Sequence, residues 1–294
     1  MTDPLLWDNL DLLISGLATG ATYALVATGF TLLWQTSSTV NFAQGDFVTL
    51  PAFAIIGLHA AGLPLPLAML GGLVIALVVL GAMFKLLMVD PLLRHGLLPL
   101  GIAAIALGVA LQEGTKAAFG AEAFPFPGLD GGVTLGPLFV NWQDMLVIGV
   151  AVLAVLALHL FLAHTRTGRC MQATAQNPDV ARILGIPVPR MIMLTFLLNA
   201  ALVTLAAILI SPAILVKFDN GGSIGLAAFC AAIIGGFNQV RGAIVGGLLL
   251  GVVENFAAVY GPDQYRAAVP MLLLIGFVLF RPQGLLGRAT ERAV

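Results

Sequence analysis

The feature that most constrains this chain is a series of apolar runs, several of them long enough to cross a lipid bilayer. A helix needs about 20 apolar residues to cross the ~30 Å hydrocarbon core. Hydrophobic residues make up 60% of the 294 residues and charged residues only 9%, whereas ordinary soluble domains carry roughly 25% charged residues. The sequence therefore predicts an all-α, polytopic integral membrane bundle that forms one domain over residues 1–294. The candidate segments are 10–34, 46–60, 66–89, 97–118, 142–163, 192–216, 224–237, 242–260 and 266–280.

These segments differ in length, which leaves the number of crossings open between about eight and nine. The runs 66–89, 142–163 and 192–216 are clearly full-length spans. The runs 46–60 and 224–237 are short and fit half-helices or tilted pieces inside the bundle. Non-helical backbone at membrane depth is tolerated only there or along a cavity.

The positions of Lys and Arg predict an orientation, because these residues concentrate in cytoplasmic loops. With nine crossings and the N-terminus outside, only Lys116, Lys217 and Arg266 fall on the outer side. The sequence therefore predicts the N-out, C-in topology. The positive residues placed on the cytoplasmic side are Lys85, Arg94, Arg166, Arg169, Arg182, Arg190, Arg241, Arg281, Arg288 and Arg292.

The longest polar interruption, residues 164–190, has its own helix signals. One helix is expected after Gly168, and a second has Asn177 as N-cap, Pro178 at its first position and Gly185 as its stop. Its apolar side chains at 180, 183 and 184 share a flank. This pattern predicts a docking surface for a cytoplasmic partner. The alternative is a basic loop that only fixes topology.

The chain lacks the sequence motifs that several classes of protein require. Lys85, Lys116 and Lys217 do not follow a glycine, so the chain has no G-x-x-x-x-G-K-[ST] phosphate loop and cannot itself be an ATPase of that class. The histidines are scattered and Cys170 and Cys230 lie far apart, so neither a catalytic group nor a metal site is expected. We expect no enzyme activity and no cofactor in this chain. The net charge of −1 also argues against a nucleic-acid partner.

Ionisable residues within the apolar runs are few. Glu113 lies near the end of one run and Glu254 lies well inside 242–260. Because intramembrane charges are costly, Glu254 is a functional candidate; the alternative is an interhelical hydrogen bond that fixes packing. A proton- or ion-driven transporter usually needs more buried carboxylates than this.

Two stretches rich in small residues, 16–47 and 225–255, each contain a polar break, at 41–45 and 235–239. Interrupted segments in corresponding halves of a chain point to a substrate path near the membrane midplane. Small faces also occur simply because helices pack closely. On the outer side, the loop 119–141 is a candidate contact for an extracytoplasmic partner or a plain connector.

Five motifs, in order, resemble those of the branched-chain amino acid permeases of ATP-binding cassette (ABC) transporters, of the LivH type. They are GATYALVATGFTL (20–32), VNFAQGD (40–46), ATAQNPDVARILGI (173–186), AAIIGGFNQVRGAIVGG (231–247) and RPQGLLGR (281–288). The similarity covers nearly the whole chain. One departure is Phe237 with Asn238, where the family usually has a small residue after the glycine pair.

The resemblance implies a non-catalytic importer subunit in the bacterial inner membrane. Its partners would be a second, LivM-like permease, two cytoplasmic ATPases that bind ATP and Mg²⁺, a periplasmic solute-binding protein and membrane lipid. Branched-chain or related amino acids are the expected substrates, although similar permeases serve urea, amides or small carboxylates. The rival interpretation is a stand-alone secondary transporter or channel for a small polar solute.

Specific residues follow from these interpretations. The candidates for ATPase coupling are Ala173, Ala175, Asn177, Arg182, Leu184 and Gly185. The candidates for the translocation path are Tyr23, Thr28, Asn41, Phe42, Gln44 and Glu254.

Overall fold

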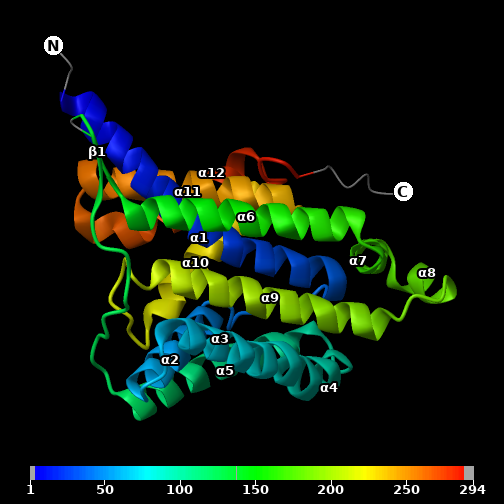
Figure 1. Cartoon of the computed structure of the whole chain (residues 1–294). Helices are drawn as coiled ribbons and strands as arrows, with labels where there is room; N and C mark the ends of the chain where they lie inside the picture. The colour runs from blue at the N-terminus through cyan, green and yellow to red at the C-terminus, as the bar shows by residue number, and fades with distance from the viewer. Residues whose placement is uncertain (1–3, 137, 288–294) are drawn as a thin grey trace.

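The computed structural model describes residues 4–136 and 138–287, and these form a bundle of helices (Figure 1). Within the described residues, six helical segments are long and apolar enough to cross a membrane. The predicted all-α membrane bundle is therefore confirmed, while the expected eight or nine crossings and their orientation stay predictions. The six segments are Trp7–Ser37, Leu65–Leu93, Leu97–Phe119, Trp142–His164, Val188–Ile210 and Val240–Tyr260.

The remaining apolar helices are shorter, as expected for 46–60 and 224–237. The α-helices are α1 (Pro4–Ser37), α2 (Asp46–Ala60), α3 (Leu65–Ala76), α4 (Asp90–Leu93), α5 (Leu97–Phe119), α6 (Trp142–His164), α7 (Arg166–Gln176), α8 (Pro178–Ile183), α9 (Val188–Ile210), α10 (Asn220–Gly235), α11 (Val240–Tyr260) and α12 (Val269–Phe280). A π-helix, η1 (Leu77–Val89), continues α3, and a 3₁₀ turn, η2 (Asp263–Ala268), precedes α12. Two short strands are β1 (Gly132–Leu135) and β2 (Leu138–Asn141).

Proline explains the largest difference between a predicted span and its helix. The apolar run 192–216 predicts a helix throughout, but α9 ends at Ile210. Pro212 follows closely, and because proline has no N–H it cannot continue the helix's ladder of hydrogen bonds. At the other end, α9 begins earlier than expected, at Val188, with Pro189 in its first turn, where proline's missing N–H costs no hydrogen bond.

The first helix, α1, lies at the centre of the bundle and packs against α6, α9, α10 and α11. Its closest neighbour is α11. A Cβ added at Gly20 would lie 2.8 Å from the carbonyl oxygen of Gly247 and 2.8 Å from Cα of Leu248, so only glycine lets the two backbones approach this closely. The stretches 16–47 and 225–255 thus pack against each other, which accounts for their small residues. Their part in a substrate path stays a prediction.

The two ends of the bundle carry different structures. Figure 1 shows α7 and α8 at the right-hand end, beyond the end of α6 and the start of α9, and the start of α1 with β1 at the left. The strands pair antiparallel, with Gly132 opposite Asn141, and Phe124 forms a bridge with Val216. The loop 119–141 is therefore partly ordered by strand pairing and is not an irregular connector throughout.

The segment after α12 returns to the turn between α10 and α11. The N–H groups of Leu285 and Leu286 donate to the carbonyls of Ile234 and Gly235 at 2.8 and 3.0 Å. These carbonyls end α10 and have no partner inside their own helix. Arg288 and Arg292, which the predicted topology places on the cytoplasmic side, lie outside the described residues.

Candidate functional site

The polar segment 164–190 begins with a helix that is firmly attached to the bundle. Oγ1 of Thr165 accepts a hydrogen bond from the N–H of Gly168 at 2.9 Å, so α7 begins at Arg166 and the expected start after Gly168 is wrong. Met171 and Thr174 are buried. A Cβ at Gly168 would lie 2.6 Å from Cα of Leu162, which brings α7 tightly against the end of α6.

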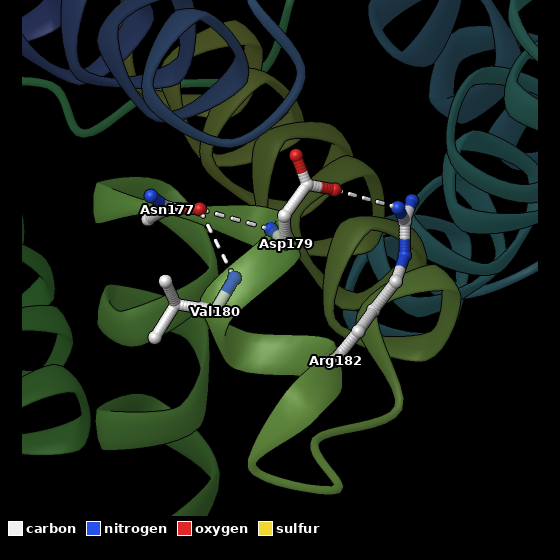
Figure 2. A network of polar contacts seen from close by, with 4 residues as sticks. All are labelled: Asn177, Asp179, Val180 and Arg182. Atoms are coloured by element: carbon white, nitrogen blue, oxygen red, sulfur yellow. Dashed lines mark hydrogen bonds and ion pairs between the residues drawn. The ribbon is translucent and has the colours of Figure 1, made fainter.

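The second helix, α8, is closed at both ends as the sequence predicts. Oδ1 of Asn177 accepts from the N–H groups of Asp179 and Val180 at 3.0 and 3.1 Å (Figure 2). At the other end Gly185 has φ +78°, and its N–H donates to the carbonyl of Arg182 at 3.0 Å. The N–H of Ile186 reaches back to the carbonyl of Ala181 at 3.0 Å, which completes a Schellman motif.

The flank predicted on α8 is exposed. Ile183 and Leu184 are 85% and 70% exposed, and only Ala181 is buried. Figure 2 shows the side chain of Val180 pointing away from the ion pair between Asp179 and Arg182, whose atoms are 2.9 Å apart. An exposed ion pair stabilises little, whereas a cluster of exposed apolar side chains marks an interaction surface.

The six coupling candidates lie on two neighbouring helices. Arg182 lies in the last turn of α8, Asn177 and Leu184 cap the helix, and Gly185 follows it. Ala173 and Ala175 are half-buried on α7. Their contact with a partner stays a prediction.

A second polar region is the break between α1 and α2, residues 38–45, and it is mostly buried. Nδ2 of Asn41 donates to Oε1 of Gln44 at 3.2 Å. Nε2 of Gln44 donates to Oδ1 of Asn199 at 2.6 Å, and Nδ2 of Asn199 donates back at 3.1 Å. All three amides are buried, so they satisfy one another where water is excluded. We call this group the amide cluster.

Helices on several sides close around the break. A Cβ at Gly29 of α1 would lie 2.7 Å from Nε2 of Gln44, and a Cβ at Gly45 would overlap the carbonyl oxygen of Gly221 on α10. Immediately after the break, Oδ1 of Asp46 accepts from Nε2 of Gln112 on α5 at 2.8 Å. The break is therefore held by α1, α5, α9 and α10 together.

Asn199, Asp46 and Gln112 are not among the candidates that the sequence predicts. Within the apolar runs, the sequence predicts a functional role for the ionisable residue Glu254 but for no amide. A lone amide inside an otherwise apolar run was the available signal for Asn199, because buried polar groups in a membrane need partners. Asp46 lies within the 40–46 motif but is not one of its chosen path residues.

Of the remaining path candidates, Tyr23 and Glu254 lie close to each other, and the others lie apart from them. Tyr23 and Thr28 are buried on α1, whereas Phe42 is 54% exposed and lies beside Phe229, with ring centroids 6.5 Å apart. Oε1 of Glu254 accepts from Nε of Arg266 at 3.2 Å. The partner of Glu254 is thus a residue of η2, which precedes α12, and the ion pair ties α11 to that turn. The path role of these residues stays a prediction.

A cavity of about 960 Å³ lies elsewhere, between α1, α6, α7 and the start of α11. None of the path candidates lines it, and Ala175 is the one coupling candidate that does. Among the described residues, no three His, Cys, Asp or Glu side chains gather as metal ligands would.

Known transport proteins resemble this chain over nearly its whole length. Residues 12–278 match the family described as "Branched-chain amino acid transport system / permease component". The chain is 33% identical to the high-affinity branched-chain amino acid transport system permease protein BraD of Pseudomonas aeruginosa, over 97% of this chain and 98% of that protein. It is 30% identical to the corresponding protein LivH of Escherichia coli, over 95% and 96%.

The chain also resembles more distant proteins. The fructose import permease protein FruG of Bifidobacterium longum is 26% identical over 82% of this chain and 74% of its own length. The solved structure of PsaBC from Streptococcus pneumoniae in complex with Fab aligns with 92% of this chain and 89% of its own, at 16% identity. Its TM-score of 0.47 is too low to establish a common fold.

Proposed function

This chain belongs to the family of branched-chain amino acid transport permeases, and on that premise we propose that it is the non-catalytic, membrane-spanning subunit of an ABC importer. In this role α8 docks on a cytoplasmic ATPase, and α7 carries the ATPase's motion into the spans. The observation that carries the proposal is the exposed apolar flank of α8, on a helix that is capped at both ends and lies beyond the membrane-length helices.

The packing supports a mechanical route from α8 to the centre of the bundle. The short helix contacts α7 and the start of α9, and α7 packs against α1, α6 and α9. A displacement of α8 therefore reaches three membrane-length helices, including the central one. Rigid packed elements of this kind transmit small shifts as whole-helix movements.

We place the α7–α8 end in the cytoplasm and the β1–β2 hairpin outside, in a bacterial inner membrane. The described residues at the α7–α8 end include four arginines between 166 and 190, and short cytoplasmic loops are rich in such residues. With α2, α10 and α12 each counted as a crossing beside the six membrane-length segments, the chain makes nine passes. The tail near Leu285 then also lies at the cytoplasmic end, because it binds the α10–α11 turn, which lines the same cavity as α7.

The partners in this proposal are a second permease, two ATPases and a periplasmic solute-binding protein, and the substrate is a branched-chain or related amino acid. BraD and LivH are both named for branched-chain amino acid transport, which supports this substrate. FruG is named for fructose import, so the substrate is tested directly, by screening amino acids, urea, amides and small carboxylates in the uptake assay.

The decisive experiment replaces the α8 flank in the reconstituted importer. The double variant Ile183→Ser and Leu184→Ser should lower ATP-driven uptake by about tenfold or more, because buried apolar anchors carry most of the binding energy of an interface. Membrane insertion should be unchanged, since both side chains are exposed. Leu98→Ser, a 76% exposed leucine of α5 outside the docking segment, is the matched control.

Two further α8 variants test the helix itself. Gly185→Pro should also uncouple uptake, because proline cannot adopt φ +78°, and Arg182→Glu should do so by reversing a charge on the docking helix. Wild-type uptake in all three α8 variants would refute docking. Solute movement by the purified chain without any ATPase would instead establish the stand-alone transporter.

A further inference from the structure

The cavity between α1, α6, α7 and the start of α11 has an apolar part and a polar part, segregated along its length. We call it the α6–α11 groove. Small and aliphatic side chains form one part: Ala21, Ala24, Val152, Val155, Ile244 and Leu248. Hydrogen-bonding and cationic side chains gather at the α7 end: Gln35, His159, Gln172, Gln176, Gln239 and Arg241.

The charge at the polar end has one sign. Arg241 makes no ion pair with any described residue, and no acidic side chain lines the groove in the described part of the chain. Several amides and an imidazole line the same end of the groove. Arginine with neighbouring hydrogen-bond donors is the arrangement that binds a phosphate group.

The length of the groove matches one membrane leaflet. The residues of α1 that line it run from Ala21 to Thr36. At 1.5 Å per residue, this stretch of helix is about 22 Å long. Half of the hydrocarbon core together with one headgroup region is also about 20–22 Å thick. The volume of about 960 Å³ is at the upper end of ligand pockets, which span roughly 300–1,000 Å³.

We propose that the α6–α11 groove binds one anionic phospholipid, with its phosphate at Arg241 and an acyl chain along the wall formed by Val155, Ile244 and Leu248. The inference goes beyond the proposed function, because binding requires only that the chain lies in a bilayer. The cytoplasmic leaflet, where the α7 end is placed, is the one rich in anionic lipids. A lipid in this position touches α7 and the α10–α11 turn at once, and so links α7 to α11.

The test measures lipid retained by the purified full-length chain, by native mass spectrometry. Detergent-solubilised protein is titrated with phosphatidylglycerol or with phosphatidylcholine of the same acyl chains. Wild-type protein should retain phosphatidylglycerol about fivefold better, the preference that one basic side chain near a headgroup provides. Arg241→Gln should remove that preference, whereas Arg190→Gln, an exposed arginine at the same end but outside the groove, should keep it.

A second pair of variants separates the groove from general surface charge. Leu156→Trp fills the apolar part and should lower retention of both lipids, while Leu153→Trp, on the same helix outside the lining, should not. Equal retention of the two lipids by wild-type protein overturns the proposal, as do equal losses in the two arginine variants. Should Leu156→Trp fail to fold, the arginine pair decides alone, because both arginines are exposed.

Discussion

The break between α1 and α2 and the α7–α8 segment are both polar interruptions of an apolar chain, yet their hydrogen bonds go to different places. In the break, Gln44 bonds to Asn199, 155 residues away. At the start of α8, the side chain of Asn177 bonds only to the next residues along the chain. The polar side chains of the break find their hydrogen-bond partners on other helices of the bundle, whereas the cap of α8 finds its partners within α8.

This difference suggests separate roles: the break stabilises the bundle, whereas α8 is free to contact a partner. Because the break is surrounded by α1, α5, α9 and α10, a change there should be felt as a loss of stability of the whole chain. Because α8 is exposed and locally closed, a change there should leave the bundle intact. The following predictions test that contrast, from the largest expected loss of stability to the smallest.

The largest effect is expected from Gly45→Ala. A Cβ at this position would overlap the backbone of Gly221 and lie 2.8 Å from Cα of Gly225, so α2 and α10 must separate. Overpacking of this kind costs about 3 kcal/mol. The measurement is the thermal transition of the purified chain in detergent. Gly149→Ala, where the added Cβ meets nothing within 4 Å, should unfold like the wild type; a similar drop in both would refute the close approach.

A smaller loss is expected from Asn199→Leu. Its Oδ1 accepts from Nε2 of Gln44 and its Nδ2 donates back to Gln44. The variant therefore leaves the buried Nε2 of Gln44 without an acceptor, at a cost of about 1–3 kcal/mol. Asn255→Leu, which removes a half-buried amide with one long bond of 3.4 Å, should cost less. Denaturant titration in detergent compares the free energies of unfolding of the two variants. Equal losses would mean that the amide cluster stabilises the chain no more than the single bond of Asn255 does.

Gly185→Ala should act on α8 alone. An L-residue at φ +78° costs about 1–2 kcal/mol, but the added methyl group meets nothing within 4 Å. We therefore expect faster hydrogen exchange in residues 177–186 and an unchanged global transition. Gly222→Ala also places its Cβ in open space, with ordinary backbone angles, and should change neither. A lowered global transition in Gly185→Ala would show that α8 supports the bundle.

The smallest effect is expected from Arg182→Gln. The ion pair with Asp179 is largely exposed, so its loss should change the free energy of unfolding by less than about 0.5 kcal/mol. Arg190→Gln provides the matched loss of one charge. Denaturant titration measures the free energy of unfolding of both variants. A larger loss in the Arg182 variant would mean that the ion pair stabilises α8 in addition to its caps.

The same contrast explains what the sequence can predict. The ends of α8 are predicted correctly because Asn177, Pro178 and Gly185 act on neighbouring residues. The start of α7 is missed because Thr165, which lies before Gly168 in the chain, offers an earlier cap. The amide cluster could not be predicted, since nothing near Gln44 indicates that Asn199 lies opposite. Path candidates such as Tyr23 and Glu254 share the same difficulty, because their neighbours are set by helix packing.

The hydrogen bonds from Leu285 and Leu286 to the end of α10 have a practical consequence for expressing the protein. A chain shortened at Phe280 would retain every helix of the described residues and still lose two donors, exposing the carbonyls of Ile234 and Gly235. Purification tags are therefore best fused downstream of residue 287, so that the two hydrogen bonds to the end of α10 are kept.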